Sequence, residues 1–422
     1  MEVMIERCAG LDVHQATVVA CVRIRDGGKR ARREVRTFGT MTGELEELRD
    51  WLGEHGVSHV GMESTSVYWR PVYAVLEGHA ELIVGNARHI RNVPGRKTDV
   101  KDAEWIADLV AHGLIRPSYV PPRPLRELRE LTRYRRKLTE LQAAERNRLQ
   151  MQLETANIKL ASVATDVLGV SGRAMLRALI KGEAGPDTMA DLARGRLRSK
   201  RAELARALDG RMDETQRILL AMQLRRVEQT EQQIEELDRR IDERLKPYRA
   251  EMALLMQIPG VDRVHAAVVV AEIGIDMAVF LSVHHLAAWA GVCPASHESA
   301  GKRRNIGVRH GNKHLRTALF EAAMAGSRTK ASYFRDKFHR LKARRGAKRA
   351  GLAIAHKILI AIWHMLTRRA DYRDLGAAWL DQLDQQRTAR NLRRRLEHLG
   401  YQVTMVPTEP TSRIVQANAQ AD

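Results

Sequence analysis

Four acidic residues in the N-terminal part of the chain have the types and spacing of a metal site. Asp12 follows an apolar run in GLDVHQ, Glu63 ends another in GMESTS, and Asp99 and Asp102 stand three apart in GRKTDVKDAEWIADL. An acid at the end of a buried run costs free energy unless a cation compensates its charge. Residues i and i+3 of a helix share one face, so a helix crossing the strand ends can present both of its acids there. Converging carboxylates of this kind are hard oxygen ligands for Mg²⁺ or Mn²⁺.

Such a site would be suited to phosphoryl transfer. Two ions polarise the phosphate, orient or generate the nucleophile, and stabilise the leaving oxygen of an in-line displacement. Arg96 and Lys97 stand just before Asp99, where they can grip the backbone of the strand being cut. The sequence therefore predicts a nucleic-acid-cutting centre in this part of the chain.

Each of these acids also has an ordinary explanation. Asp99 is a good N-cap, Asp102 favours the helix dipole, and an exposed Glu63 needs no role. Glu104 and Asp108 lie in the same expected helix as alternative ligands, with Glu104 facing away from Asp102. The combination of acids at two strand ends and at a helix start is what favours a metal site.

A second group of reactive side chains lies in the stretch from Gly291 to Arg316. Ser299 stands at its entrance in ESAGKR, beside Glu298, the one acid of the stretch. The basic residues that follow are Lys302, Arg303, Arg304, Arg309, Lys313 and Arg316. A serine hydroxyl is a poor nucleophile unless a base removes its proton or a cation stabilises the alkoxide. The stretch is predicted to bind phosphates, with Ser299 either as nucleophile or as an ordinary turn residue.

The tetrapeptide IPGV, residues 258–261, resembles half of a helix-hairpin-helix, whose backbone amides hold a DNA phosphate. Gly260 would make that contact, although Asp262 stands where the motif has a second glycine. Farther along, the basic run KARRGAKR at 342–349 predicts general contact with a nucleic-acid backbone or a solvated face.

The elements expected before residue 100 alternate strands and helices. An apolar run broken at His14 and Gln15 predicts a hairpin over 8–23. Further strands are expected at 34–38, 58–62 and 81–84, with helices at 43–55 and 70–77. A three-strand start followed by βαβ units is the order of the ribonuclease H fold.

The rest of the chain is expected to be mainly helical. Long helical runs cover 125–156 and 212–245, and the second carries an apolar heptad seam that Glu231 interrupts. That seam predicts antiparallel pairing or dimerisation. We expect an α/β domain over 1–122, a helical coiled-coil arm over 123–250, a mostly α-helical domain over 251–370, and a basic helix with a disordered tail over 371–422.

Composition points to a polyanionic partner. The 422 residues include 71 Lys and Arg against 51 Asp and Glu, a net charge of +20. Such an excess is typical of nucleic-acid-binding proteins. Three cysteines without a CxxC pair predict neither a disulfide scaffold nor a zinc module. An N-terminus with early charges and no long uninterrupted apolar run favours a soluble, unexported protein with no membrane partner.

These stretches together resemble the transposases of the insertion sequence 110 family. The similarity is carried by GLDVH, GMESTS, GRKTDVKDAEWIADLVAHGLIRPSYVPP, RELRELTRYRRKL, IPGV and LAAWAGVCPASHESAGKRRNIGVRHGNKHLR. The resemblance implies that Asp12, Glu63, Asp99 and Asp102 are the metal-binding acids of a RuvC-like domain. It also implies that Ser299 is the nucleophile of a C-terminal transposase domain.

The resemblance further implies that Ser299 attacks a DNA phosphate and leaves a covalent phosphoserine link that is later rejoined. In that arrangement one subunit's acids complete the site with another subunit's serine, within a homodimer or homotetramer. The partners would be donor and target double-stranded DNA and a structured guide (bridge) RNA, in a bacterial cytoplasm at the nucleoid. Two rivals stay open: a metal-dependent junction-resolving nuclease that uses water, and a non-enzymatic nucleic-acid-binding scaffold.

Overall fold

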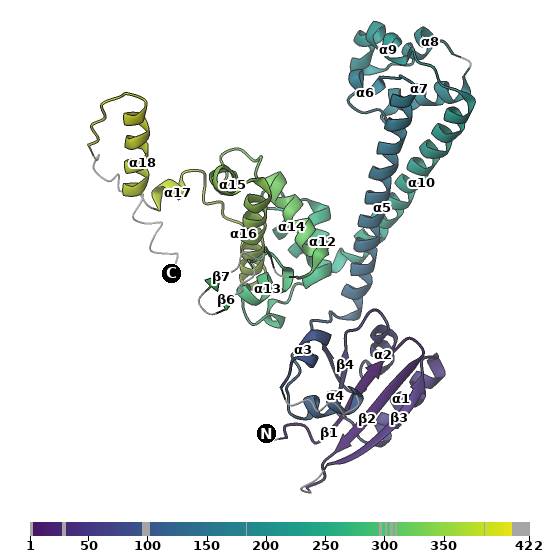
Figure 1. The fold of residues 1–422 in the computed structure, drawn as a ribbon, viewed down its shortest axis with the longest axis vertical. Coiled ribbons are helices and arrows are strands. Elements are labelled where there is room, and N and C mark those ends of the chain that lie inside the picture. The colour runs from purple at the N-terminus through teal and green to yellow at the C-terminus, as the bar shows by residue number, and fades with distance from the viewer. Residues whose placement is uncertain are drawn as a thin grey trace. The chain divides into compact units, whose positions relative to one another are not determined.

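The computed structural model divides the chain into two compact units, Met1–Pro121 and Pro122–Asp422. It describes residues 3–27, 31–94, 102–182, 184–294, 298–299, 302–303, 307–308, 310–383 and 385–406. The first unit is built around strands and the second is largely helical (Figure 1). Each unit is treated by itself below.

The first unit contains a five-stranded mixed sheet in the order β3-β2-β1-β4-β5. Strands β1 (Arg7–Val13), β2 (Thr17–Ile24) and β3 (Arg32–Gly39) form an antiparallel meander. Strand β4 (His59–Glu63) pairs in parallel with β1, and β5 (Glu81–Gly85) pairs in parallel with β4. This is the ribonuclease H-like order predicted from the sequence, and the prediction of an α/β unit followed by helices is confirmed.

Helices cover both faces of this sheet. Helices α1 (Thr42–Glu54) and α2 (Trp69–Leu76) pack on one face, where alternate residues such as Leu11 and Met62 join their buried leucines in one core. Helix α4 (Asp102–Ala111) covers the other face, with Ile106 and Leu109 in a second core that also holds Cys8. The short α3 (Ala87–Arg91), not expected from the sequence, adds Ile90 to it.

Two glycines allow α4 to lie directly on the sheet. A Cβ atom at Gly10 of β1 would come within 2.2 Å of the Ala103 carbonyl oxygen and 2.3 Å of the Ala107 nitrogen. A Cβ at Gly61 of β4 would meet the side chain of Val110 at 2.3 Å. The absence of side chains at these two positions therefore fixes where α4 crosses β1 and β4.

The second unit begins with a long helical hairpin. Helices α5 (Arg123–Thr155) and α10 (Glu214–Arg244) run side by side in Figure 1. Arg135 bonds to Asp238 near one end and Arg146 pairs with Glu231 farther along, so the two helices are antiparallel. The heptad seam predicted for α10 is thus confirmed as an antiparallel pairing within the chain, and dimerisation through it stays a prediction.

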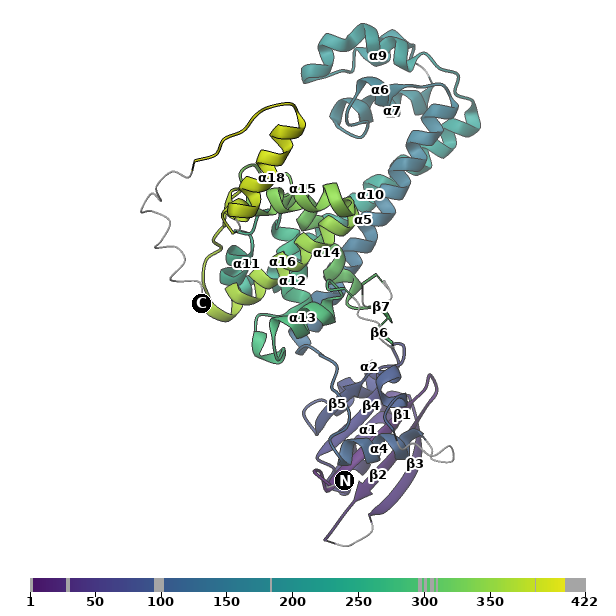
Figure 2. The same cartoon turned by 60° about the vertical axis from the view of Figure 1, so that its left-hand side comes forward.

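A small helical cap, not foreseen from the sequence, closes the far end of this hairpin (Figure 2). It consists of α6 (Leu160–Val163), α7 (Val170–Lys181), α8 (Pro186–Ala190), the 3₁₀ helix η1 (Gly195–Lys200) and α9 (Arg201–Leu208). Its apolar core joins Leu176 and Leu204 to Leu153 of α5 and Leu220 of α10. The cap is therefore continuous with the hairpin's own core.

The remaining helices form a bundle around α16 (Ala347–Arg368). The elements of this bundle are η2 (Lys246–Tyr248), α11 (Arg249–Leu255), α12 (Arg263–Ile273), η3 (Met277–Val279), α13 (Val283–Ala290), α14 (Lys313–Gly326) and α15 (Tyr333–Arg345). Helix α16 has the length and apolar composition of a membrane-spanning helix. Its Ile354, Ile358 and Ile362 are fully buried, as in the core helix of a folded domain.

Two helices follow the bundle, α17 (Trp379–Gln382) and α18 (Gln385–His398). Helix α18 is the basic helix expected near residues 389–399, and no residue of it is buried. The tail at 407–422, predicted to be disordered, lies outside the described residues.

Candidate active site

Asp12 and Glu63 lie on the same face and at the same edge of the sheet. Leu11 pairs with Met62 in the parallel β1/β4 register, and each acid is the next residue of its strand. Leu11 and Met62 face the α1/α2 core, so the alternation of strand side chains places both acids on the α4 face. Their side chains are 26% and 19% exposed, enough for a ligand to reach them.

The third described acid, Asp102, is the first residue of α4 on that same face. Ala103, the next residue, lies against Gly10, two positions before Asp12 in β1. Close packing of α4 on Gly10 therefore brings the start of this helix to the part of the sheet that carries the two strand acids. Asp99, Arg96 and Lys97 lie outside the described residues, and their roles stay predictions.

Polar neighbours that the sequence analysis did not single out hold the two strand acids. His14 Nε2 lies 3.1 Å from Asp12 Oδ2. The Thr65 hydroxyl donates to Glu63 Oε1 at 2.5 Å, and Arg91 Nη2 lies 4.0 Å from the same oxygen. His14 and Thr65 each follow their acid by two residues, within the GLDVH and GMESTS motifs, which was the available signal.

The two alternative acids of α4 have other partners. Asp108 accepts hydrogen bonds from Arg23 at 3.1 Å and from Arg33 at 2.7 Å, and Glu104 lies 3.6 Å from Arg33. Both acids thus neutralise arginines of β2 and β3. In this geometry Glu104 and Asp108 are structural acids that tie α4 to the meander.

Two buried thiols lie beneath this helix. Cys8 and Cys21 are fully buried, and burial raises the pKa of Cys8 to about 11 and that of Cys21 to about 12. Thiols with such pKa values stay protonated near neutral pH and are inert in exchange chemistry. Cys8 and Cys21 are therefore core residues of the first unit.

The donor chemistry of the site fits a hard divalent cation. Asp12, Glu63 and Asp102 supply carboxylate oxygens and no sulfur or imidazole, as Mg²⁺ and Mn²⁺ prefer. Within the part of the chain that the structure describes, no three acids, histidines or cysteines stand close enough to make a complete ligand set. The fourth predicted ligand, Asp99, would have to join the strand acids and Asp102 to complete it.

The serine stretch is anchored on a short antiparallel ladder in the second unit. Strands β6 (Glu298–Ser299) and β7 (Lys302–Arg303) pair so that Ser299 is opposite Lys302 and Glu298 opposite Arg303. A further bridge joins Pro294 to Val308. This pairing brings the backbone of Ser299 beside that of a lysine. Arg304 and Arg309 lie outside the described residues.

The stretch ends at α14, whose first turn carries two of the predicted phosphate contacts. Lys313 is exposed and Arg316 is half-buried. The side chain of Asn312 caps the helix by accepting from the backbone N–H groups of His314 and Leu315 at 3.0 and 3.1 Å. The Asn312 backbone N–H also donates to the Trp289 carbonyl of α13 at 3.0 Å. Asn312 therefore fixes where the stretch meets the bundle.

Asn312 is itself held by a buried carboxylate that the sequence analysis missed. Glu272 of α12 has no exposed side-chain surface, and its Oε2 accepts from Asn312 Nδ2 at 2.6 Å. Arg133 of α5 donates to both carboxylate oxygens at 2.7 and 2.8 Å, and Arg129 lies 3.1 Å away. Burial alone would raise the pKa of Glu272, yet these three partners hold it below its usual value. The signal was a single acid within the apolar run VVVAEIG.

Gly260 has a packing role in the structure. Its φ is +89°, and a Cβ atom would come within 2.1 Å of the Ala322 carbonyl oxygen in α14. Asp262 caps α12 by accepting from the His265 backbone N–H at 2.9 Å. Glycine is thus required for the turn to pack on α14. The phosphate contact of Gly260 stays a prediction.

Comparisons with known proteins match two separate stretches of the chain. A DEDD-type model described as "Transposase" matches residues 9–158, and a model described as "Transposase IS116/IS110/IS902 family" matches residues 252–339. The chain belongs to the IS110 family of transposases. Its members are DNA phosphoryl-transfer enzymes, and the DEDD domain suggests a divalent metal. The acids at 12, 63, 99 and 102 fall in the first match and Ser299 in the second.

Individual relatives are similar to this transposase over different spans. The "Transposase for insertion sequence element IS1111A" of Coxiella burnetii is 37% identical over 123 residues, 28% of this chain and 34% of the relative. The "Probable family 20 transposase" of Pseudomonas aeruginosa is 26% identical over 336 residues, 78% of this chain and 89% of the relative. The chain thus matches about a third of the first relative's length and most of the second's.

Proposed function

We propose that this transposase cuts and rejoins DNA with Asp12, Glu63, Asp99 and Asp102 as metal ligands and Ser299 as nucleophile. The observation that supports the metal site most directly is the placement of Asp12 and Glu63. They occupy equivalent ends of adjacent parallel strands, on the face where α4 begins with Asp102. Neither strand acid is paired with an arginine as closely as Asp108 is, so their charge is available to a cation.

Bound there, Mg²⁺ would polarise the scissile phosphate and stabilise the leaving oxygen. The protein's own contribution begins with the Ser299 hydroxyl, which loses its proton as its oxygen bonds to phosphorus. The bond between phosphorus and the leaving strand oxygen then breaks, and that oxygen takes up a proton. Positive side chains after Ser299 stabilise the alkoxide and the pentavalent phosphate.

The wider assembly belongs to the same proposal. We infer that a structured guide RNA selects donor and target DNA, and that subunits pair as a homodimer or homotetramer in the bacterial cytoplasm. The net charge of +20 supports a polyanionic partner and suits an RNA as well as DNA. A metal site and a serine in separate units support a composite site completed between subunits.

The test is strand cleavage of the element's end DNA by the purified full chain, titrated with Mg²⁺ and with Mn²⁺. Cleavage is expected to need a divalent ion and to disappear in Asp12→Asn and Glu63→Gln, because each change removes one ligand charge while keeping shape. Asp108→Asn is the matched control, since Asp108 pairs with arginines. Cleavage by Asp12→Asn at the wild-type rate would remove that residue from the site.

A further inference from the structure

The helical cap of the hairpin carries a basic surface whose charges are not paired. Residues 159–211, which form this cap and are called the tip from here on, lie between the two family matches at 9–158 and 252–339. Lys and Arg outnumber Asp and Glu in the tip. The tip therefore has the charge of an anion-binding surface, and neither family match covers it.

The strongest concentration is the basic turn, defined here as residues 194–200. Arg194, Arg196, Arg198 and Lys200 are all exposed. Among the described residues none of these four side chains makes an ion pair or a hydrogen bond, whereas the neighbouring Arg201 pairs with an aspartate. Four free cations within seven residues repel one another, and a polyanion would relieve that repulsion.

The backbone of the basic turn is nevertheless held firmly. The Arg194 backbone N–H donates to the Ser171 hydroxyl of α7 at 2.9 Å, and Ser171 is buried. Ala193 before the turn and Leu204 after it are buried, and Leu197 between them packs against the same core. Contacts before, within and after the basic turn thus hold its backbone, while its four charged residues are exposed. Such a preorganised arrangement lowers the entropy lost on binding.

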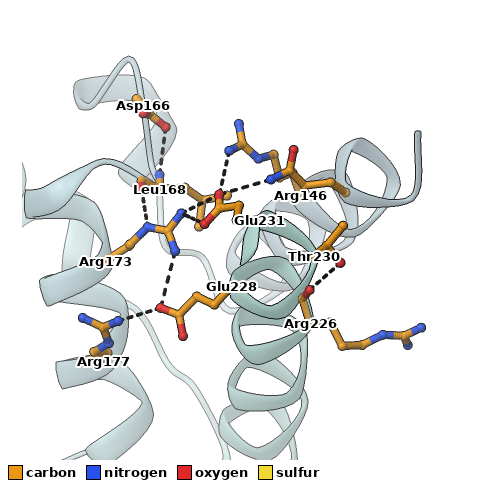
Figure 3. Close-up of polar contacts among 10 residues, drawn as sticks. Arg146, Asp166, Leu168, Arg173, Arg177, Arg226, Glu228, Thr230 and Glu231 are labelled. Atoms are coloured by element: carbon orange, nitrogen blue, oxygen red, sulfur yellow. Dashed lines mark hydrogen bonds and ion pairs between the residues drawn. The ribbon is translucent and has the colours of Figure 1, made fainter. Parts of the chain in front are cut away.

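The tip is also fixed to the long hairpin by a network of ion pairs (Figure 3). Arg173 of α7 donates to both oxygens of Glu231 at 2.7 Å and lies 3.4 Å from Glu228. Arg177 pairs with Glu228 at 2.6 Å, and Arg146 of α5 pairs with Glu231 at 3.1 Å. Glu231, the residue that interrupts the apolar seam of α10, is therefore the anchor of the tip. Ion pairs and a shared apolar core therefore join the tip to the hairpin.

The composition of the tip indicates which polyanion it suits. The tip contains no Phe, Tyr, Trp or His. Proteins that read single-stranded nucleic acid stack its bases on aromatic side chains, which the tip lacks. Arginine and lysine side chains alone favour the regular phosphate backbone of a duplex.

We propose that the basic turn binds the phosphate backbone of double-stranded DNA without reading its sequence. DNA is the occupant because it is the substrate of this transposase family. The proposal adds a DNA-binding site that is separate in sequence from the serine stretch and does not depend on Ser299 or on the metal. It gives the long hairpin a function in holding DNA in addition to its place in the chain between the first unit and the helical bundle.

The experiment measures binding of the full chain to a 30-bp duplex of arbitrary sequence in EDTA, where cleavage is suppressed, across a salt series. The variant is Arg196→Gln with Arg198→Gln. Its matched control is Arg225→Gln with Arg226→Gln, two exposed arginines of α10 that also lose two charges. We expect the first variant alone to bind roughly tenfold more weakly at 100 mM salt and to lower the slope of log K against log salt by about 2.

Both variants should keep the thermal midpoint of the wild type, because these arginines are exposed. An unchanged affinity and slope in the Arg196 and Arg198 variant would overturn the proposal. An equal loss of affinity in the two variants would also overturn the proposal, because the loss would then follow from the change in net charge alone. A loss confined to a structured RNA probe, with duplex DNA binding intact, would reject DNA as the occupant. Cleavage assays of the same variants under saturating DNA separate this grip from the proposed chemistry, which they should leave intact.

Discussion

Gly10 in β1 faces the backbone of α4 so closely that a Cβ atom would lie 2.2 Å from the Ala103 carbonyl oxygen. Ala103 follows Asp102, and Gly10 precedes Asp12 by two residues in GLDVH. The contact therefore connects the helix that begins with one candidate ligand to the strand that carries another. The GLDVH motif therefore supplies both a packing residue, Gly10, and a candidate ligand, Asp12.

Gly10→Ala is expected to destabilise the first unit by about 1–3 kcal/mol, because α4 must move away from β1. Gly53→Ala is the control, since a Cβ atom at Gly53 of α1 meets nothing within 4 Å. There the change should be neutral or stabilise by about 0.5–1 kcal/mol. Urea unfolding of the two variants measures both effects. Equal stability of the two variants would show that α4 does not rest on Gly10.

Asp102→Asn is expected to stop metal-dependent strand cleavage while leaving folding and nucleic-acid binding largely intact. One ligand charge is lost, and loss of the favourable helix-dipole interaction costs only about 0.3–1 kcal/mol. Glu104→Gln is the matched control on the same helix, because Glu104 lies 3.6 Å from Arg33. A cleavage rate near that of wild type in Asp102→Asn, measured with Mg²⁺, would exclude Asp102 from the metal site.

The strand order and the two long helices of the hairpin could be predicted because their patterns are local. The break at His14 and Gln15 indicated the β1/β2 turn, which the antiparallel pairing of these two strands confirms. The tip escaped prediction because its helices are short and bury their apolar residues against distant positions of the hairpin. Glu231 looked like a defect in a seam because its partner Arg173 lies 58 residues away in the sequence.

The sequence predicted that the site is built from carboxylates, but it could not tell which acids of α4 pair with arginines instead. Acids at the ends of apolar runs indicated Asp12 and Glu63 because burying a charge is costly. The sequence left Asp108 open as an alternative ligand on the same helix as Asp102, and only its contact with Arg33 in the structure gives it another role. Glu272 was missed because its partners Arg129 and Arg133 lie about 140 residues earlier in the chain, so no local pattern connects them.

Glu272→Gln should be strongly destabilising. Breaking a buried ion pair by removing one partner costs about 3–5 kcal/mol, since it leaves Arg133 and Arg129 uncompensated. Glu140→Gln, at an exposed pair with Arg136, should cost less than about 1 kcal/mol. The folded-state pKa of Glu272 lies below the usual 4.5, so its charge stabilises the fold above pH 4.5. That contribution is lost as the pH falls through the lowered value.

Unfolding curves of wild type and Glu272→Gln at several pH values check this directly. The difference in unfolding free energy should be full near neutral pH and should shrink as the solution is acidified below pH 4.5. If the difference in unfolding free energy grew as the pH fell, the pKa of Glu272 would not be lowered in the folded protein. If Glu272→Gln proves too unstable to purify, its thermal midpoint in cell lysate against that of Glu140→Gln gives the same ranking.

Nucleic-acid binding by the serine stretch is expected to weaken steeply with salt, because its cations displace counterions from phosphates. Replacing Lys302, Arg303 and Arg304 together by alanine should lower the slope of log K against log salt by about 3. Titration of a labelled duplex at several salt concentrations measures the slope. Unchanged affinity together with an unchanged slope would show that the stretch does not grip phosphates.

Ser299 is expected to become covalently joined to DNA during the reaction. Its strand pairs with β7, where Lys302 is opposite it, so the backbone arrangement places a cationic residue beside the serine. Ser299→Ala should lose all strand exchange, because the oxygen that bonds to phosphorus is absent. Ser296→Ala, three residues earlier in the same stretch, is the matched control and should keep it.

The covalent step has a direct readout. Denaturing the protein during the reaction, digesting it and finding a nucleotide on the Ser299 peptide would identify the attacking oxygen. Asp12→Asn should prevent formation of that peptide adduct, since the proposed serine attack requires the metal site. Full recombination by Ser299→Ala, with metal-dependent cleavage retained, would exclude the serine. The acids at 12, 63, 99 and 102 would then activate water, as in a junction-resolving nuclease.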